Sequence, residues 1–199
     1  MKQLVLASGN PGKLRELSAI LGELGYQLHA QSEFDVDEVA ETGTTFVENA
    51  IIKARHAATI TGLPALADDS GIEVDALDGA PGVYSARFAG ANADDAANNA
   101  LLVDKLRNVP PAERSARYRA VIVLMRHAAD PSPLICEGSW EGMIQLDPAG
   151  DGGFGYDPYF FLPDLGCTSA QLSASEKNRL SHRGAALEEL KRKLKAQDV

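Results

Sequence analysis

The segment Ala67-Asp68-Asp69-Ser70-Gly71 joins two apolar stretches, residues 63–67 and 72–76, and both have the pattern of β-strands. Carboxylates at a strand end suit a divalent metal or a water, because Mg²⁺ prefers hard oxygen ligands and takes one or two carboxylates from the protein. Neighbouring side chains of a strand point to opposite faces, so Asp68 and Asp69 cannot both face one ligand unless the strand is interrupted there. We therefore expect one of them to be catalytic and the other to support it.

The same segment also has the composition of a polar turn, because Asp, Ser and Gly are favoured where a chain reverses direction. Taken alone, it fits a turn that closes a hairpin better than it fits a catalytic site. The rest of the chain has to decide between the two interpretations.

The composition of the chain sets the first limits. Its 199 residues are 45% hydrophobic and 24% charged, which is typical of an ordinary globular protein, and they are enough for one sizeable domain or two small lobes with a real core. We expect a single domain over residues 1–199, with no separate linker domain. The net charge of −9 argues against a broad surface for a nucleic-acid polymer or an anionic membrane, since such binding requires clustered cations. A small anionic ligand requires only a few local Lys or Arg residues and stays compatible.

The cysteines and the apolar runs indicate a cytoplasmic protein. Cys136 and Cys167 stand 31 positions apart, a spacing that predicts neither a disulfide framework nor a zinc site, so we expect reduced thiols. The apolar run at residues 4–7 is too short for the core of a signal peptide, and the run at residues 120–125 is far short of a membrane span.

Near the N-terminus, the pattern predicts a strand at residues 3–7, then the turn Ser8-Gly9-Asn10-Pro11-Gly12-Lys13, then a helix with a leucine-rich stripe. Such a turn presents backbone N–H groups and the positive end of a helix dipole to an anion, and Lys13 adds a full charge. The glycine spacing matches neither a Walker A loop nor a dinucleotide-binding fingerprint. A plain connection between strand and helix explains the local pattern equally well.

A second helix is predicted from a capping box. Thr45 and Glu48 have the Ser/Thr-x-x-Glu spacing that satisfies free N–H groups of a first helical turn, and the helix should run to about Gly62. Capping competes with any role of Glu48 as a metal ligand, and we favour the capping role.

The middle of the chain contains a long glycine-punctuated loop, residues 79–90, which is expected to be functional or to contact a partner subunit. A helix is predicted at residues 94–107, with Ala97, Leu101, Leu102 and Leu106 facing inward. Pro110 and Pro111 mark the expected boundary between the lobes.

A long strand at residues 115–127 and another strand or strand pair at residues 134–146 are predicted to precede a loop with four glycines between Gly150 and Gly155. Such a loop lets a ligand approach the backbone closely, and Phe154 or Tyr156 could stack on a flat ring. A flexible hairpin connection with buried aromatics is the alternative.

The last segment has two helix starts, a capping box at Ser173 and Glu176 and a cap at Ser181. Lys177, His182 and Arg183 lie close to these starts, where the helix dipole disfavours cations unless an anion is also bound. We therefore favour phosphate contact over a solvated charge cluster.

Together, these features supply a carboxylate of the kind that binds metals, two cationic helix N-termini and an aromatic platform, a set that would hold a nucleoside triphosphate. In these residues the chain resembles the Ham1-like inosine triphosphate pyrophosphatases, also called non-canonical purine NTP pyrophosphatases or dITP/XTP diphosphatases. The matching segments span nearly the whole chain: residues 8–13, residues 41–50 with Lys53 and Ala54, residues 67–71, 79–87, 152–158 and 181–183.

The resemblance implies an elongated α/β fold of two lobes, with a central mixed sheet, helices packed around it, an active site in the cleft between the lobes, and a homodimer. It implies hydrolysis of ITP, dITP or XTP to the monophosphate and pyrophosphate, with Mg²⁺ as cofactor. The implied site residues are Asp69 as metal-associated general base; Ser8, Gly9, Asn10, Pro11, Gly12 and Lys13 at the triphosphate; Lys53 and Ser70 at the nucleotide; Phe154, Gly155, Tyr156 and Asp157 around the base; and Lys177, His182 and Arg183 at phosphate and base.

One departure from the family concerns the metal. Many members have two glutamates where this chain has Ala40-Glu41, so we assign Glu41 as the second metal carboxylate, with Glu48 as the alternative. The runner-up enzyme is a Maf-like nucleotide pyrophosphatase, against which Lys13 and the Ser-His-Arg sequence at residues 181–183 argue. A nucleotide-binding regulatory module without catalysis is the alternative from another class, and it requires the two aspartates to be only structural.

Overall fold

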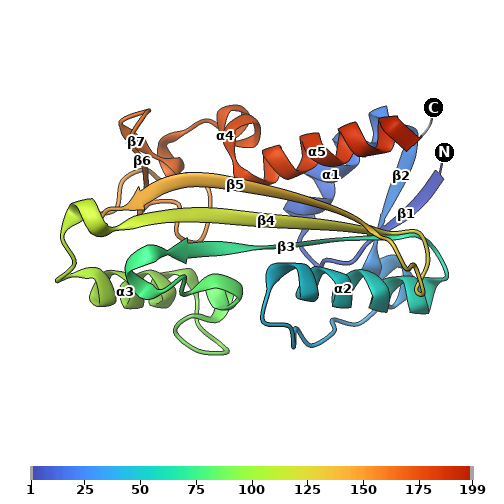
Figure 1. Cartoon of the computed structure of the whole chain (residues 1–199), viewed down its shortest axis with the longest axis horizontal. Coiled ribbons are helices and arrows are strands. Elements are labelled where there is room, and N and C mark those ends of the chain that lie inside the picture. The colour runs from blue at the N-terminus through green and yellow to red at the C-terminus, as the bar shows by residue number, and fades with distance from the viewer. Residues whose placement is uncertain (1, 198–199) are drawn as a thin grey trace. The chain divides into compact units, whose positions relative to one another are not determined.

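The computed structural model describes residues 2–197, apart from the side chains of Pro11, Glu16 and Gln197. Strands and α-helices alternate up to Met125, and after it come three strands and then two helices. The strands are β1 (Lys2–Leu6), β2 (Tyr26–Ala30), β3 (Ala65–Val74), β4 (Ser115–Met125), β5 (Leu134–Ile144), β6 (Phe160–Leu162) and β7 (Cys167–Thr168). The α-helices are α1 (Pro11–Glu23), α2 (Phe46–Thr61), α3 (Asp95–Leu106), α4 (Ala174–Leu180) and α5 (His182–Gln197). Figure 1 labels these elements.

The strands form a mixed sheet in the order β2-β1-β3-β4-β5-β6-β7. β1 runs parallel to β2 and β3, whereas β6 runs antiparallel to β5 and β7. The predicted α/β fold with a mixed sheet is therefore confirmed. β6 and β7, of three and two residues, were not predicted, because so short a run carries no readable alternation.

The chain forms two compact units. Unit 1 contains the described residues up to Asp69, Ala120–Glu137 and the described residues from Ala185 onward, and unit 2 contains Ser70–Arg119 and Gly138–Gly184. The boundary predicted at Pro110 and Pro111 is wrong, because both prolines lie inside unit 2, where Pro111 begins a 3₁₀ turn, Pro111–Glu113.

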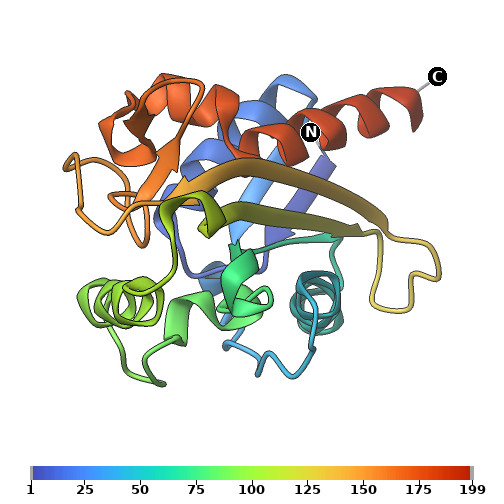
Figure 2. The ribbon, with the colours of Figure 1, turned by 60° about the vertical axis from the view of Figure 1, so that its left-hand side comes forward.

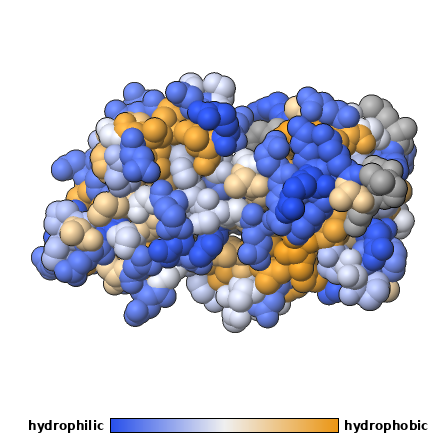
Figure 3. Space-filling view, turned by 45° about the horizontal axis from the view of Figure 1, so that its top comes forward, coloured by the Kyte–Doolittle hydropathy of each residue, from blue (hydrophilic) through white to orange (hydrophobic). Residues whose placement is uncertain are grey.

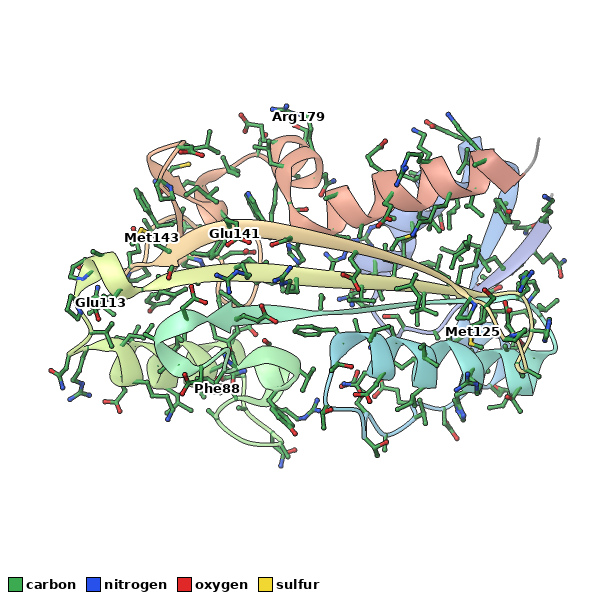
Figure 4. All side chains as sticks on the ribbon, viewed as in Figure 1. Phe88, Glu113, Met125, Glu141, Met143 and Arg179 are labelled. Carbon is green, nitrogen blue, oxygen red and sulfur yellow. The ribbon has the colours of Figure 1, made fainter. Side chains whose placement is uncertain are left out.

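Unit 1 is built in three layers, with helices on both faces of its strands (Figures 1 and 2). Alternating side chains of β1 divide between the faces: Leu4 and Leu6 pack against α1 and α5, and Val5 packs against α2. On the α2 side the helix contributes a stripe of buried alanines, and Met125 lies between the end of β4 and this helix (Figure 4). The small side chains let the helix pack closely on the sheet, as the sequence predicts.

Local capping explains where the helices of unit 1 begin. Asn10 caps α1, because its Oδ1 accepts hydrogen bonds from the N–H groups of Gly12 at 2.8 Å and Lys13 at 3.2 Å. The predicted capping box of Thr45 and Glu48 opens α2, which ends at Gly62 with φ of 67°. A left-handed residue at a helix end favours glycine, which has no Cβ to clash.

β3 is one continuous strand through Asp68, Asp69 and Ser70. The two separate strand-like stretches expected around these residues are therefore one element, and the hairpin turn is wrong. The pairing with β1 reaches Leu66, and β3 also has β4 as its other hydrogen-bonded neighbour in the sheet. Pairing within the sheet overrides the local preference of Asp and Ser for turns.

Unit 2 has its own core around Phe160, whose ring packs edge-on against Tyr118 at 4.7 Å between centroids. α3 begins at Asp95 with Asp94 as its N-cap, close to the prediction, but its buried face differs. Asn98 and Asn99 are buried and Ala97 is exposed, so the inward position predicted for Ala97 is wrong. The loop at residues 79–90 has structure of its own, a 3₁₀ helix at Gly82–Arg87.

The face shown in Figure 3 is mainly hydrophilic, with separate apolar patches. Cys136 and Cys167 are free thiols, as predicted. Among the described residues, no helix is both long and apolar enough to cross a membrane.

Candidate active site

The two adjacent carboxylates of β3 bind different lysines, as the alternation of a strand requires. Asp68 is 2% exposed, and its Oδ2 pairs with Lys13 Nζ at 2.6 Å. Asp69 is 7% exposed, and its Oδ1 accepts a hydrogen bond from Lys53 Nζ at 2.5 Å. The sequence predicts different roles for the two aspartates, and in the structure they have different partners.

Lys53 makes further contacts around Asp69. Its ammonium also donates to Glu41 Oε1 at 3.0 Å and to the backbone carbonyl of Asp68 at 3.2 Å. Lys53 lies in the middle of α2, and Glu41 lies in the segment before that helix. The carboxylates of Asp69 and Glu41 therefore converge on one cation.

Burial changes the proton affinity of this cluster. It raises the pKa of the Asp69 carboxyl above its ordinary value, although the charge of Lys53 opposes the change. Burial lowers the pKa of Lys53, but attraction to Asp69 and Glu41 outweighs it, and the net pKa of the lysine is raised. Lys53 thus stays a cation, while Asp69 accepts a proton more readily than an ordinary aspartate.

Glu48 has a different task. Its Oε2 accepts hydrogen bonds from the backbone N–H and the hydroxyl of both Thr44 and Thr45, at 2.9 to 3.1 Å. These bonds lower the pKa of Glu48, with the Thr45 hydroxyl contributing most. The capping role favoured for Glu48 is confirmed, and the geometry leaves Glu41 beside Asp69.

The turn after β1 is organised by its own side chains. The N–H of Asn10 donates to Ser8 Oγ at 3.2 Å, and Asn10 in turn caps Gly12 and Lys13. A Cβ on Gly12 would lie 3.1 Å from Asn10 Oδ1, so glycine leaves room for the cap. Gly9 is exposed; Pro11 is the first residue of α1, and its side chain is outside the described part of the structure.

A divalent cation implied by the resemblance can be tested against these donors. Over residues 2–197, three or more His, Cys, Asp or Glu side chains nowhere gather as a metal cluster. Mg²⁺ is usually held by one or two carboxylates together with waters and phosphate oxygens, rather than by a cage made only of protein groups. Asp69 and Glu41 fit such an ion if a phosphate-bearing ligand completes its coordination.

The glycine loop of unit 2 is tightly packed against the protein itself. A Cβ on Gly153 would lie 2.0 Å from Asp157 Oδ2, and one on Gly152 would lie 2.7 Å from the carbonyl of Ala170. The close approach that glycine permits is therefore used by the chain's own atoms at these two positions. Gly155 has φ of 61° and open space around it, so there the backbone conformation favours glycine.

Asp157 holds this loop together from a position that is 2% exposed. Its Oδ2 accepts from the N–H of Phe154 at 2.8 Å and pairs with Lys177, while its Oδ1 accepts from Ser169 Oγ at 2.8 Å. The Lys177 ammonium also lies 4.9 Å from the centroid of the Phe154 ring. The resemblance placed Asp157 and Lys177 around a ligand; in the structure they are bound to each other beside Phe154.

The structure separates the two aromatic candidates of the loop. Phe154 is 61% exposed, whereas Tyr156 is 4% exposed and its hydroxyl donates to the carbonyl of Ser85 at 2.7 Å. The ring available for stacking is therefore that of Phe154, and the ring of Tyr156 belongs to the core of unit 2.

The remaining predicted residues of unit 2 lie near the start of α5. His182 is 7% exposed and stacks on Tyr118, with ring centroids 4.8 Å apart. Arg183 Nη2 donates to Ser70 Oγ at 3.4 Å, which brings two predicted nucleotide contacts together. The hydroxyl of Ser181 accepts from the N–H of Gly184 at 3.2 Å, as expected of a helix cap.

Two side chains that contact the glycine loop were not predicted from the sequence. Asp95 Oδ2 accepts from the N–H of Gly155 at 2.7 Å, and Asn99 Nδ2 donates to the carbonyl of Gly155 at 2.9 Å. The available signal was the Asn98-Asn99 pair on a helix otherwise rich in Ala and Leu, because an asparagine turned inward requires polar partners.

Comparison with known proteins gives one consistent family. The sequence model of the Ham1 family matches residues 4–193. A protein of Xanthomonas oryzae named dITP/XTP pyrophosphatase is 63% identical over 196 residues, covering 98% of both chains. A protein of Vibrio parahaemolyticus with the same name is 58% identical over 197 residues, covering 99% of this chain and 98% of the relative.

Solved structures agree with the sequence comparison. A HAM1 protein from Coxiella burnetii superposes with a TM-score of 0.95 at 52% identity, covering 98% of this chain and all of the other. A structure from Mycobacterium abscessus, described as a nucleoside-triphosphatase and dITP/XTP pyrophosphatase, has a TM-score of 0.81 at 44% identity. It covers 94% of this chain and 98% of its own.

Proposed function

Because this chain belongs to the Ham1 family, we propose that it hydrolyses the non-canonical purine nucleoside triphosphates dITP, ITP and XTP to the monophosphate and pyrophosphate. The full-length relatives named dITP/XTP pyrophosphatase support this substrate class. The structural observation that carries the proposal is the convergence of Asp69 and Glu41 on Lys53 at the end of the β3 segment in unit 1.

In the proposed reaction, a water attacks the α-phosphorus and the bond from that phosphorus to the bridging oxygen breaks, so that pyrophosphate leaves. Asp69 takes the proton of the water. Its raised pKa suits this role, because a general base works best when its pKa lies near the working pH. Lys53 holds the carboxylate in place through Oδ1.

Cations stabilise the charge that develops on the phosphates. Lys13 and the start of α1 are assigned to the triphosphate. Asn10 already satisfies the N–H groups of Gly12 and Lys13, so the attraction comes mainly from the lysine and the helix dipole. Positioning and charge stabilisation supply most of the acceleration in such a scheme.

Mg²⁺ is proposed as the cofactor, held by Asp69 and Glu41 together with phosphate oxygens. When bound, it supplies positive charge that polarises the phosphoryl group. The residues of the chain then orient the water, hold the carboxylate and accept the proton.

Phe154 is proposed to stack on the purine, and Lys177, His182 and Arg183 to contact phosphate and base. A site that donates hydrogen bonds to the 6-oxo group disfavours adenine, because its amino group would leave buried donors unpaired. This accounts for selection of hypoxanthine and xanthine over adenine.

One assay tests the proposal against its alternatives. The protein is incubated with Mg²⁺ and each of dITP, ITP, XTP, GTP and ATP, and pyrophosphate is measured separately from orthophosphate. We expect pyrophosphate, formed fastest from dITP, ITP and XTP. Orthophosphate alone, or no turnover, would contradict the proposal, and the latter result would favour a regulatory module. A preference for canonical or pyrimidine nucleotides would favour a Maf-like activity.

We also propose that the protein acts as a homodimer in the cytoplasm. The free thiols support the compartment, and the exposed Tyr84 in the segment 79–90 supports a subunit contact there. Light scattering on the purified protein should give twice the mass of one 21.1 kDa chain.

A further inference from the structure

Gly155 is held at both of its backbone polar groups by one face of α3. Asp95 accepts from its N–H at 2.7 Å and Asn99 donates to its carbonyl at 2.9 Å. The two residues are four positions apart, so they lie one turn apart on the same side of the helix. One face of α3 therefore holds both peptide groups that flank Gly155, one through an acceptor and the other through a donor.

This arrangement fixes the chain on both sides of Phe154. Asp157 Oδ2 accepts from the N–H of Phe154, and the N–H of Asp157 donates to the carbonyl of Phe154 at 3.3 Å. The next N–H, that of Gly155, is held by Asp95. The exposed ring of Phe154 thus projects from a backbone segment in which three consecutive polar groups are hydrogen-bonded: the N–H and carbonyl of Phe154 and the N–H of Gly155.

The burial of Asn99 indicates that the contact has a purpose. Asn99 is 8% exposed, and its Oδ1 is buried without a hydrogen-bond partner among the described residues. Burying an amide with one unsatisfied atom costs free energy, whereas an apolar side chain like those of Leu102 and Leu106 on the same helix would not. The bond to Gly155 is what Asn99 provides that a leucine cannot.

We propose that Asp95 and Asn99 are positioning residues of the base site: they act through Gly155 to fix the Phe154 ring, and so they set the affinity for the nucleobase rather than the rate of hydrolysis. The inference rests on the proposed function, because it takes Phe154 as the base platform. Neither residue has to touch the substrate.

Asn98 provides a matched control on the same helix. It is 3% exposed, and it likewise bonds a backbone donor and acceptor, the N–H of Ala89 at 2.8 Å and the carbonyl of Ala86 at 3.2 Å. These lie in the segment that carries Phe88, labelled beside α3 in Figure 4. Asn98→Ala therefore removes a similar buried amide without touching the glycine loop.

The experiment compares Asp95→Ala, Asn99→Ala, Asn98→Ala and Phe154→Ala by steady-state hydrolysis of dITP. We expect Asp95→Ala and Asn99→Ala to raise KM by about fivefold to tenfold, the effect of one lost hydrogen bond, with kcat within about twofold of wild type. Asn98→Ala should lower the melting temperature as Asn99→Ala does, but leave KM within about twofold. Inhibition by tripolyphosphate, which lacks a base, should be unchanged in all four variants.

Two further measurements separate positioning from general destabilisation. In the Phe154→Ala background, Asn99→Ala should cause no further rise in KM, because the ring on which it acts is absent. Asp95→Asn keeps an oxygen that can accept from Gly155 and should recover most of the lost affinity. Asp95 is exposed, so its variants test the proposal even if Asn99→Ala folds poorly.

Unchanged KM in both Asp95→Ala and Asn99→Ala would overturn the inference, as would effects that add fully to those of Phe154→Ala. Failure of the proposed function looks different: the wild-type protein would then fail to release pyrophosphate from dITP. If wild type turns over dITP and Phe154→Ala raises KM while the α3 variants do not, only the inference fails.

Discussion

Two networks of carboxylates and cations in this molecule differ in almost every physical respect. In unit 1, Lys53 joins Asp69 and Glu41, and the side chain of Asp69 is 10% exposed. In unit 2, Arg117 binds Asp75 through both terminal nitrogens at 2.7 and 2.9 Å and donates to Glu141 at 3.0 Å. The side chain of Asp75 is 44% exposed, and Glu141 lies on β5 in Figure 4.

The two aspartates respond in opposite directions. Burial raises the pKa of Asp69, while the hydrogen bonds from Arg117 and Ser115 lower the pKa of Asp75 to about 2. A carboxylate with lowered pKa is a poor base and serves as a fixed anion. A buried carboxylate with raised pKa can exchange a proton, so the opposite shifts accord with the role proposed for Asp69 and with a structural ion pair at Asp75.

The largest expected effect is on turnover. Asp69→Asn keeps the size of the side chain and removes the base, so kcat for dITP should fall by about a hundredfold to ten-thousandfold, the usual contribution of a general base. Circular dichroism should show an intact fold. Near-normal hydrolysis would remove Asp69 as the base and erase the contrast with Asp75.

The next largest effect is on stability. Lys13→Ala removes the ammonium that pairs with Asp68, whose side chain is completely buried, and breaking a buried pair costs about 3–5 kcal/mol. Urea unfolding should show this loss, and the double variant Lys13→Met, Asp68→Asn should recover much of it. A stable Lys13→Ala protein with unchanged KM would contradict both the buried pair and the phosphate role of Lys13.

A third prediction concerns the metal. Glu41→Gln should raise the Mg²⁺ concentration for half-maximal activity by at least about tenfold, because it removes one of two anionic ligands. Glu48→Gln is the control, since its amide oxygen can still accept from Thr44 and Thr45. If Glu48→Gln shifts the Mg²⁺ requirement and Glu41→Gln does not, the assignment of the ligand is reversed.

The next prediction concerns the pKa of Asp69, which burial raises. The carboxyl of Asp69 in the metal-free protein should therefore titrate above the ordinary aspartate value of 3.8. Carbon-13 NMR of the carboxyl groups without Mg²⁺ measures this pKa, and Asp69→Asn assigns the signal. A titration of Asp69 below 3.8 in the metal-free protein would contradict the effect of burial.

The smallest effect should come from Asp75→Asn. Its partner network is exposed to solvent, so the variant should lose only about 0.5 kcal/mol or less at neutral pH and keep full turnover. Because the folded pKa of Asp75 lies below 3.8, its contribution is present above that pH and disappears as the pH falls towards 2. A pH-independent loss of stability, or reduced activity, would contradict a purely structural role for the Arg117–Asp75 ion pair.

Features set by neighbouring residues were predictable from the sequence. The starts of α2 and α4 followed from the capping boxes at Thr45 and Ser173, because a cap joins residues three positions apart. The continuity of β3 was not predictable, since it depends on pairing with the neighbouring strands β1 and β4 rather than on the local composition.

The candidate site was likewise predictable only in part. Its residue types were recognisable, but their partners come from distant parts of the chain: Lys13 lies 55 positions from Asp68, and Lys53 lies 16 positions from Asp69. The bonds from Asp95 and Asn99 to Gly155 span 60 and 56 positions, so no local pattern could assign those residues to the loop.

The contact between Gly153 and Asp157 has an evolutionary consequence. An alanine at position 153 would collide with the Asp157 carboxylate, and a smaller residue at 157 would first abandon Phe154, Ser169 and Lys177. Gly153 also has φ of 76°, so a side chain there is strained even where the carboxylate is absent. We therefore expect glycine to stay fixed at this position, and a library that randomises both positions should return active variants only with Gly153.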